Sequence, residues 1–294
     1  MNFLSGYIGI IGPPNVGKST LLNRIVGRKV AIVSPKPQTT RNRIIGVYNE
    51  ASVQMVFLDT PGIHATRTPL HKSMVASAIA AFHEVDILLV MVEAGLREHS
   101  GIPPIFKNLK GIKTPCVLLI NKVDKVSKEM LLPIIADYGS RHPFSAVIPI
   151  SALTGDGIDR LVDDLRSRLR PGPRFFPEDM DTDQSESFLI SEVIREKIYL
   201  HMRQELPYAS AVTVDEIQDM AHRNLMAISA RIHVESASQK GMFIGRGGKM
   251  IQMIGRSARL ELERLFGVQI YMDLSVRVEK NWTKDTRALS RFGY

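Results

Sequence analysis

A run near the N-terminus, Gly12-Pro13-Pro14-Asn15-Val16-Gly17-Lys18-Ser19, has the residue types and spacing of a phosphate-binding loop. Glycines let the backbone wrap a phosphate chain, and the amides at the start of the following helix face the anion. Lys18 adds a positive charge near the outer phosphates, and the Ser19 hydroxyl can ligate Mg²⁺. The run predicts a nucleoside triphosphate site with contacts from Gly12, Asn15, Val16, Gly17, Lys18, Ser19 and Thr20.

A second motif, Asp59-Thr60-Pro61-Gly62, follows the apolar run 53–58. Asp59, at the end of a predicted strand, is placed to hold Mg²⁺ through water. Gly62 can offer its backbone amide to a γ-phosphate and can pivot when that phosphate leaves. Asp-x-x-Gly is common by itself, but about forty residues after a phosphate loop it indicates a nucleotide switch.

Two further motifs predict recognition of guanine. Asn121-Lys122-Val123-Asp124 follows the apolar run 117–120, and the Asp124 carboxylate can accept hydrogen bonds from the guanine ring N–H and exocyclic amine. Adenine would face that carboxylate with an acceptor, and unpaired buried polar groups make such discrimination steep. Ser151-Ala152-Leu153 follows the last strand, and we expect the Ala152 amide to reach the guanine carbonyl oxygen.

The elements that must position these motifs alternate between apolar runs and helical patterns. The sequence predicts strands over 6–11, 53–58, 87–92, 117–120 and 146–150, with helices over 20–26, 72–83 and 158–169. Continuous apolar strands separated by helices indicate an α/β fold with a mostly parallel sheet flanked by helices. We expect a GTP-binding domain over 1–172, a proline-rich linker over 173–182 and a second domain over 183–294.

The second domain carries the pattern Ile-Gly-x-x-Gly-x-x-Ile of a K-homology domain. Its GxxG loop lets an RNA backbone come close, and single-stranded bases lie in the adjacent groove. Residues 240–294 carry 11 basic and 5 acidic side chains, which favours a polyanion-binding face. We therefore predict a smaller α+β domain of the type II K-homology class that binds RNA through Ile244, Gly245, Arg246, Gly247, Gly248, Lys249 and Ile251.

Together the nucleotide motifs resemble those of small GTPases of the translation-factor class. Gln38-Thr39-Thr40-Arg41 looks like their first switch, with Thr40 as the expected residue that closes on Mg²⁺ and Thr39 as the alternative. One such GTPase domain followed by one K-homology domain resembles the Era family of bacterial GTPases over the whole chain. The resemblance implies binding to small-subunit (16S) ribosomal RNA near its 3′ end, a role in assembly of the 30S subunit, and some peripheral membrane association.

The residues predicted to take part in catalysis are Lys18, Thr40 and Gly62. Ras-type GTPases place a glutamine after Asp-x-x-Gly to orient the attacking water, but Ile63 stands there. We therefore expect slow intrinsic hydrolysis of GTP to GDP. One alternative is an RNA-binding module for which the nucleotide is only a conformational ligand. Another is a double-GTPase relative with a similar C-terminal domain, which the single phosphate loop disfavours.

Potassium is a further candidate cofactor beside GTP, GDP and Mg²⁺. In relatives of this GTPase class an asparagine at the place of Asn15 helps coordinate K⁺ beside the phosphates, where the ion supplies the charge of an arginine finger. The alternative is that Asn15 only braces the loop with its amide. Both interpretations remain open from the sequence.

Composition bounds the remaining expectations. One cysteine, Cys116, excludes an internal disulfide and fits a reducing cytoplasm; it is expected to be a buried strand residue. No apolar run approaches the roughly 18 residues of a membrane span. The expected location is the cytoplasm, with peripheral association at the inner face of the membrane implied by the resemblance, and nothing demands more than a monomer.

Overall fold

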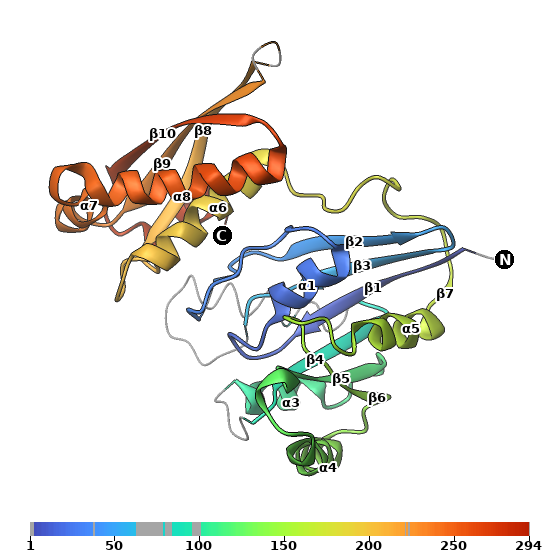
Figure 1. Cartoon of the computed structure of the whole chain (residues 1–294). Coiled ribbons are helices and arrows are strands. Elements are labelled where there is room, and N and C mark those ends of the chain that lie inside the picture. Colours follow the sequence, from blue (N-terminus) through green and yellow to red (C-terminus); the bar gives the residue numbers. More distant parts are fainter. Residues whose placement is uncertain are drawn as a thin grey trace. The chain divides into compact units, whose positions relative to one another are not determined.

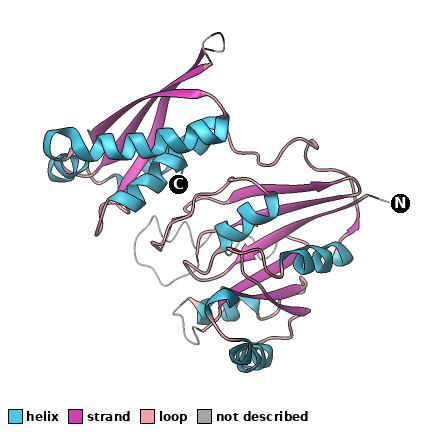
Figure 2. Ribbon diagram, viewed as in Figure 1, coloured by secondary structure: helices cyan, strands magenta, loops and turns pink. Residues whose placement is uncertain are grey.

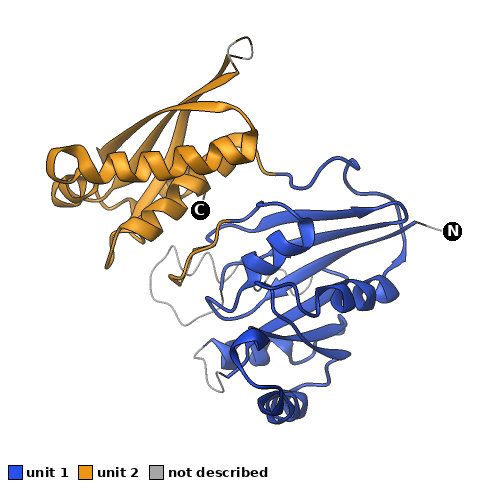
Figure 3. Cartoon of the chain, viewed as in Figure 1, with its two compact units in different colours: residues 1–31, 40–67, 71–183 blue, residues 32–39, 68–70, 184–294 orange. Residues whose placement is uncertain are grey.

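The computed structural model describes residues 3–37, 39–62, 79, 84–95, 101–220, 222 and 224–293. These residues form two compact units (Figure 3). The first unit runs to Asp183 and the second begins at Gln184, but the segment Ile32–Thr39 belongs to the second unit. Ile63 lies outside the described residues, and so does the predicted helix 72–83 except for residue 79.

The first unit is an α/β fold with a mainly parallel sheet (Figures 1 and 2). Its strand order is β2-β3-β1-β4-β5-β6, and β7 pairs with β1. The strands are β1 (Leu4–Ile11), β2 (Ile44–Glu50), β3 (Val53–Asp59), β4 (Ile87–Glu93), β5 (Cys116–Asn121), β6 (Ala146–Pro149) and β7 (Arg170–Pro171). The helices are α1 (Lys18–Val26), α3 (Ile102–Leu109), α4 (Leu131–Arg141) and α5 (Ile158–Arg168), with short 3-10 turns at Val123–Lys125 and Lys128–Met130.

Burial on both faces explains the apolar strands of this sheet. Every residue of β3 and of β5 is buried, including Cys116 as expected. The core on one face joins the strands to α3 and α4. The buried side of α5 consists of Ile158, Leu161, Val162 and Leu165, as the periodicity predicts. The prediction of a parallel α/β fold is confirmed.

In the first unit, strands β2 and β7 and helices α3 and α4 were not identified from the sequence. β2 pairs antiparallel with β3 at the edge of the sheet, and its sequence is interrupted by Gly46 and ends in polar residues. An alanine Cβ at Gly46 would lie 2.5 Å from Leu22 Cδ1 of α1. The glycine is therefore needed for close packing of α1 on β2, a reason that appears only in three dimensions.

The predicted linker is bonded to the first unit. The side chain of Gln54, fully buried on β3, accepts from the backbone N–H groups of Phe175 (2.7 Å) and Phe176 (3.0 Å) and donates to the Phe176 carbonyl (2.8 Å). The Val47 N–H donates to the Asp181 carbonyl at 2.8 Å. These bonds fix the course of the segment along β2 and β3.

The second unit packs helices on one face of a sheet with strand order β10-β9-β8 (Figure 1). Strands β9 and β10 are parallel, and β8 is antiparallel to β9. The elements are α6 (Glu186–His201), β8 (Ser210–Met220), β9 (Leu225–Val234), α7 (Ala237–Ile244), α8 (Lys249–Phe266), β10 (Gln269–Val278) and α9 (Thr286–Arg291), with 3-10 turns at Arg246–Gly248 and Trp282–Lys284. Ile254, Ala258 and Leu262 of α8, which recur at helical spacing, form its buried side.

In the described part of the chain, no helix has the length and apolar character needed to cross a membrane.

Candidate functional site

The phosphate loop connects β1 to α1 through backbone shapes that need glycine. Gly17 has a φ of 103° and caps α1, where an added Cβ would lie 2.4 Å from the Asn121 side-chain nitrogen. A Cβ on Gly12 would lie 2.5 Å from the Met91 carbonyl oxygen of β4. The two glycines therefore allow the loop to lie against the ends of the neighbouring strands, with its helix N-terminus open to an anion.

Lys18 is buried beneath this loop. Its Nζ donates to the carbonyl oxygens of Gly12 (3.2 Å) and Pro13 (3.0 Å). Burial lowers the pKa of Lys18 to about 8, although the Asp59 carboxylate favours the charged form. Phosphate oxygens would relieve the desolvation of this ammonium, so the loop suits an anionic ligand.

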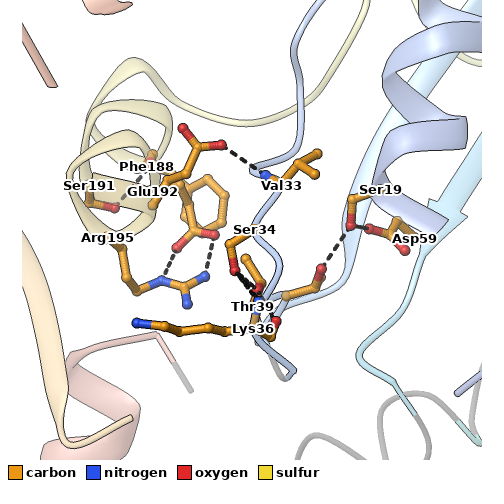
Figure 4. A network of polar contacts seen from close by, with 12 residues as sticks. Ser19, Val33, Ser34, Lys36, Thr39, Asp59, Phe188, Ser191, Glu192 and Arg195 are labelled. Carbon is orange, nitrogen blue, oxygen red and sulfur yellow. Dashed lines mark hydrogen bonds and ion pairs between the residues drawn. The ribbon is translucent and has the colours of Figure 1, made fainter. Parts of the chain in front are cut away.

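Three oxygen-bearing side chains meet beside the loop (Figure 4). Ser19 Oγ donates to Asp59 Oδ2 at 2.5 Å and lies 2.9 Å from Thr40 Oγ1. Burial raises the pKa of Asp59 to about 6, opposed by the nearby Lys18 ammonium and by hydrogen bonds. Hydroxyl and carboxylate oxygens are the hard donors that Mg²⁺ prefers. The predicted metal residues Ser19, Thr40 and Asp59 are therefore brought together with chemistry that fits this ion.

The two candidate threonines of the first switch make different hydrogen bonds, and Figure 4 labels Thr39 beside Ser34 and Lys36. Thr40 Oγ1 lies beside Ser19, whereas Thr39 Oγ1 donates to the Lys36 carbonyl at 2.8 Å and lies 2.5 Å from Ser34 Oγ. Thr39 therefore closes its own turn. Gln38 of the same predicted motif lies outside the described residues.

The turn that contains Thr39 belongs to the second unit. The Val33 N–H donates to Glu196 Oε1 of α6 at 2.9 Å, and Lys36 Nζ donates to the Met202 carbonyl. The same helix carries Arg195, which is 1% exposed and forms an ion pair with Glu192 at 2.6 Å. Local sequence patterns do not predict these contacts, because the partners are more than 160 residues apart.

Gly62 lies close to the phosphate loop. An added Cβ would lie 2.8 Å from both Pro14 Cα and Pro14 N. Just before it, Thr60 Oγ1 donates to the Ile10 carbonyl of β1 at 2.9 Å. The segment after β3 is thereby held against the phosphate loop.

The guanine motifs are joined to the phosphate loop through Asn121. Its Nδ2 donates to the Val16 carbonyl at 2.7 Å, and its Oδ1 accepts from the Ala152 N–H at 2.9 Å. The Ala152 amide, expected at the guanine carbonyl oxygen, thus has a protein acceptor in this structure. Asn121 holds three chain segments in one arrangement, a role that its motif alone does not specify.

Asp124 and Lys122 lie beside this junction. Asp124 is exposed, and its Oδ1 accepts from Ser151 Oγ at 2.6 Å, which leaves Oδ2 for a ligand. Lys122 has a φ of 65° and forms an ion pair with Glu93 of β4 at 2.5 Å. Glu93 was missed from the sequence, where it is only the last residue of an apolar run. The hydrogen bond from Ser151 restrains the exposed Asp124 carboxylate through its Oδ1 atom.

The GxxG loop of the second unit exposes its basic side chains. Gly245, Gly247 and Gly248 have φ values of 73°, 60° and 78°. Arg246 and Lys249 are exposed. The flanking residues Ile244 and Ile251 are partly buried and pack against the core of the unit, so they anchor the loop. The structure therefore presents a glycine backbone with two cations at the start of α8, a shape suited to a phosphodiester.

The fold and these two sites define a P-loop GTPase followed by a K-homology domain. Family models agree: "50S ribosome-binding GTPase" matches residues 7–122, and "KH domain" matches residues 205–283. GTPase Era of Syntrophus aciditrophicus is 53% identical over 99% of this chain and 95% of the relative, and that of Geobacter metallireducens is 49% identical over 99% and 98%.

Two solved structures resemble the whole chain. A variant of Aquifex aeolicus Era bound to GDP and AlF₄⁻ has a TM-score of 0.94 and 39% identity, covering 100% of this chain and 99% of its own. Era in complex with MgGDPNP and nucleotides 1506–1542 of 16S ribosomal RNA has a TM-score of 0.95 and 38% identity, with 99% of each chain covered. The chain belongs to the GTPase Era family. It is a GTPase, which hydrolyses GTP to GDP and phosphate.

Proposed function

We propose that this chain is a slowly hydrolysing GTP switch that binds 16S ribosomal RNA near its 3′ end and assists assembly of the 30S subunit. The observation that carries the proposal is the presence, in one chain, of a cross-bonded nucleotide site and an exposed GxxG loop with basic side chains. The Era relative solved with MgGDPNP and a 16S RNA fragment binds both ligand classes.

In the nucleotide site, we assign separate tasks to separate groups. Gly12, Asn15, Val16, Gly17 and Thr20 surround the phosphates, while Asn121, Lys122, Asp124 and the loop Ser151–Leu153 hold the guanine. Ser19, Thr40 and Asp59 would hold Mg²⁺, which neutralises charge on the outer phosphates. Lys18 stabilises the charge that develops on the γ-phosphate, and the Gly62 amide and Thr40 orient that group for attack by water.

Slow turnover follows from the residue after Gly62. An isoleucine side chain cannot orient water, and Ile63 lies outside the described residues. K⁺ would supply charge beside the phosphates in place of a side-chain donor. Asn15, whose side chain is exposed and whose backbone has a φ of 63°, is the residue proposed to hold it.

In the second unit, the RNA backbone would pass over Gly245–Gly248, with Arg246 and Lys249 near its phosphates. Ile244 and Ile251 would border the adjacent groove for bases. The proposal also includes a monomeric state and a cytoplasmic location, with peripheral association at the inner face of the membrane. These parts of the proposal rest on the family resemblance alone. Fractionation of cells at low and high salt tests the membrane association. If the protein is recovered only in the soluble fraction at both salt concentrations, the proposed association is wrong.

The direct test of function is a binding and rescue experiment. A 16S 3′-end oligonucleotide and a scrambled one are titrated with the chain in GTP and in GDP, and GTP hydrolysis is followed in parallel. Preferential binding of the native sequence supports the RNA assignment. Depletion in cells should reduce mature 30S subunits, and wild type but not a GxxG variant should restore them. Equal binding of both oligonucleotides would remove the proposed target.

A further inference from the structure

The loop Ser151–Gly155, after β6, has most of its backbone amides committed to protein acceptors. The Ser151 N–H donates to the Asp156 carbonyl at 2.9 Å, and the Gly155 N–H donates to the Ser151 carbonyl at 2.8 Å. The Thr154 N–H lies 3.2 Å from Ser151 Oγ, and the Ala152 N–H donates to Asn121. Among the described residues, no acceptor is present for the Leu153 N–H. That amide is the one the loop can offer to a ligand.

Arg24 holds the outer side of the same loop from a distant part of the sequence. It lies on α1, the helix that starts at the phosphate loop, and it is 128 residues from Ala152. Its Nε donates to the Ala152 carbonyl at 3.3 Å, and its Nη2 donates to the Leu153 carbonyl. One rigid guanidinium therefore grips two successive carbonyl groups.

Holding the Ala152 carbonyl also fixes the Leu153 amide. The two groups belong to one planar peptide unit, in which a trans C=O and N–H point in opposite directions. When Arg24 draws the carbonyl toward α1, the N–H of Leu153 must point away from α1. The Ala152 N–H on the preceding peptide is already directed at Asn121, so both ends of the residue are constrained.

We propose that Arg24 is a positioning residue for guanine recognition: from the helix that follows the phosphate loop, it grips two carbonyls of the Ser151–Leu153 loop and so aims the Leu153 amide at the guanine O6. The proposal rests on the nucleotide site assigned above. It adds a specificity function to a residue outside the sequence motifs. It also means that the base loop and the phosphate loop are joined twice, through Asn121 and through Arg24.

The discriminating property is dependence on the O6 atom. GDP and IDP both carry O6 and the N1–H, whereas 2-aminopurine riboside diphosphate lacks both and keeps the sugar and phosphates. For each nucleotide the variant is therefore compared with the wild type, so that the missing contact with Asp124 is the same in both proteins. In Arg24→Ala, affinity for GDP and IDP should fall by the same factor, about five- to tenfold for the loss of two hydrogen bonds. Affinity for the 2-aminopurine nucleotide, measured from the fluorescence of its base, should change less than about twofold.

A matched control lies four residues further along the chain, just after the end of α1. Arg28 lines the same surface hollow of about 330 Å³ as Arg24, but its side chain, 52% exposed, is paired with Asp181 instead of the loop. Arg28→Ala removes the same charge and should leave all three affinities unchanged. Arg24→Lys keeps the positive charge but lacks the two-pronged guanidinium. Its affinity for GDP and IDP should also fall relative to the 2-aminopurine nucleotide, but by a smaller factor.

The outcomes separate three cases. A fall in affinity that is equal for all three nucleotides would show that Arg24 acts through the phosphates or the fold, and would overturn the proposal. Unchanged GDP affinity in both Arg24 variants would do the same. Failure of the wild-type chain to bind any guanine nucleotide would instead overturn the proposed function. If Arg24→Ala does not fold, as judged by circular dichroism, Arg24→Lys carries the same comparison.

Discussion

The nucleotide site and the GxxG loop use opposite means to present a binding surface. In the first, buried or bonded side chains connect the ends of several strands: Lys18 lies under its loop, and Asn121 bonds to segments 105 and 31 residues away. In the second, a short stretch of four residues, of which Arg246 and Gly247 are exposed, takes its shape from positive φ angles at its three glycines. Substitutions in the nucleotide site should therefore alter which nucleotide is bound. Substitutions in the GxxG loop should alter RNA affinity through their effect on charge and backbone geometry.

The largest expected effect is a change of base specificity. In Asp124→Asn, the amide can donate to the 2-oxo group of xanthine but loses the paired acceptors for guanine. GTP affinity should fall by roughly 100-fold or more, and affinity for xanthosine triphosphate should rise. Competition binding with both nucleotides measures the shift. An unchanged preference would show that Asp124 does not contact the base. It would also contradict the idea that this region selects guanine because other bases leave buried polar groups unpaired.

Charge reversal in the GxxG loop should have the next largest effect. Arg246→Asp with Gly247→Asp places negative charge where the RNA backbone would pass, and RNA affinity should fall by roughly 100-fold at moderate salt. GTP binding should remain unchanged. A matched control with the same change in charge, Arg287→Asp with Ser290→Asp, alters two exposed positions of α9. RNA affinity that survives in the loop variant, or falls equally in both, would show that the GxxG loop is not the RNA site.

A cation effect of intermediate size would sharpen the description of the nucleotide site. GTP hydrolysis by the wild-type chain should be roughly tenfold faster in potassium than in sodium at equal ionic strength, because K⁺ would stabilise charge near the phosphates. Asn15→Ala should remove this stimulation. Steady-state rates of phosphate release for both proteins in both salts are the measurement. Equal rates in the two salts would mean that Asn15 only braces the loop.

The smallest effect concerns the backbone of the RNA loop, and two glycines four residues apart make the comparison. An added Cβ at Gly245 would lie 2.7 Å from Met250 Cβ and 2.9 Å from Met250 N, whereas at Gly241, within α7, nothing lies within 4 Å. Gly245→Ala should destabilise the chain by about 1–2 kcal/mol, and Gly241→Ala should stabilise it by about 0.5–1 kcal/mol.

Denaturant unfolding followed by circular dichroism measures both free energies. If the two variants had equal stability, the backbone of the loop would not depend on its positive φ at Gly245. RNA affinity measured on the same proteins then tests whether that shape is needed for binding: Gly241→Ala should bind as wild type does, and Gly245→Ala should bind more weakly.

The α/β fold was predictable because local patterns and the global arrangement agree. Apolar runs such as 117–120 can be buried only in a sheet covered on both faces, and a glycine-rich turn between strand and helix has few uses other than to hold phosphate. The same agreement is seen in α8, where apolar residues at helical spacing form the buried side. Edge strand β2 was not predicted, since it pairs on one side only and its polar, half-buried end weakens the apolar pattern.

By itself, the sequence determined the type of each loop, the chemistry of its motif residues and their order along the chain. Tertiary structure alone decided which of them touch: that Thr40 lies beside Ser19 while Thr39 closes a turn in the second unit, and that Asn121 and Arg24 fasten the base loop to the segment around α1. The physical reason is distance along the chain. Local patterns record whether a residue is buried or turns the backbone, but a hydrogen bond between positions 24 and 152 leaves no local trace, because its partners meet only when the strands that carry them have paired.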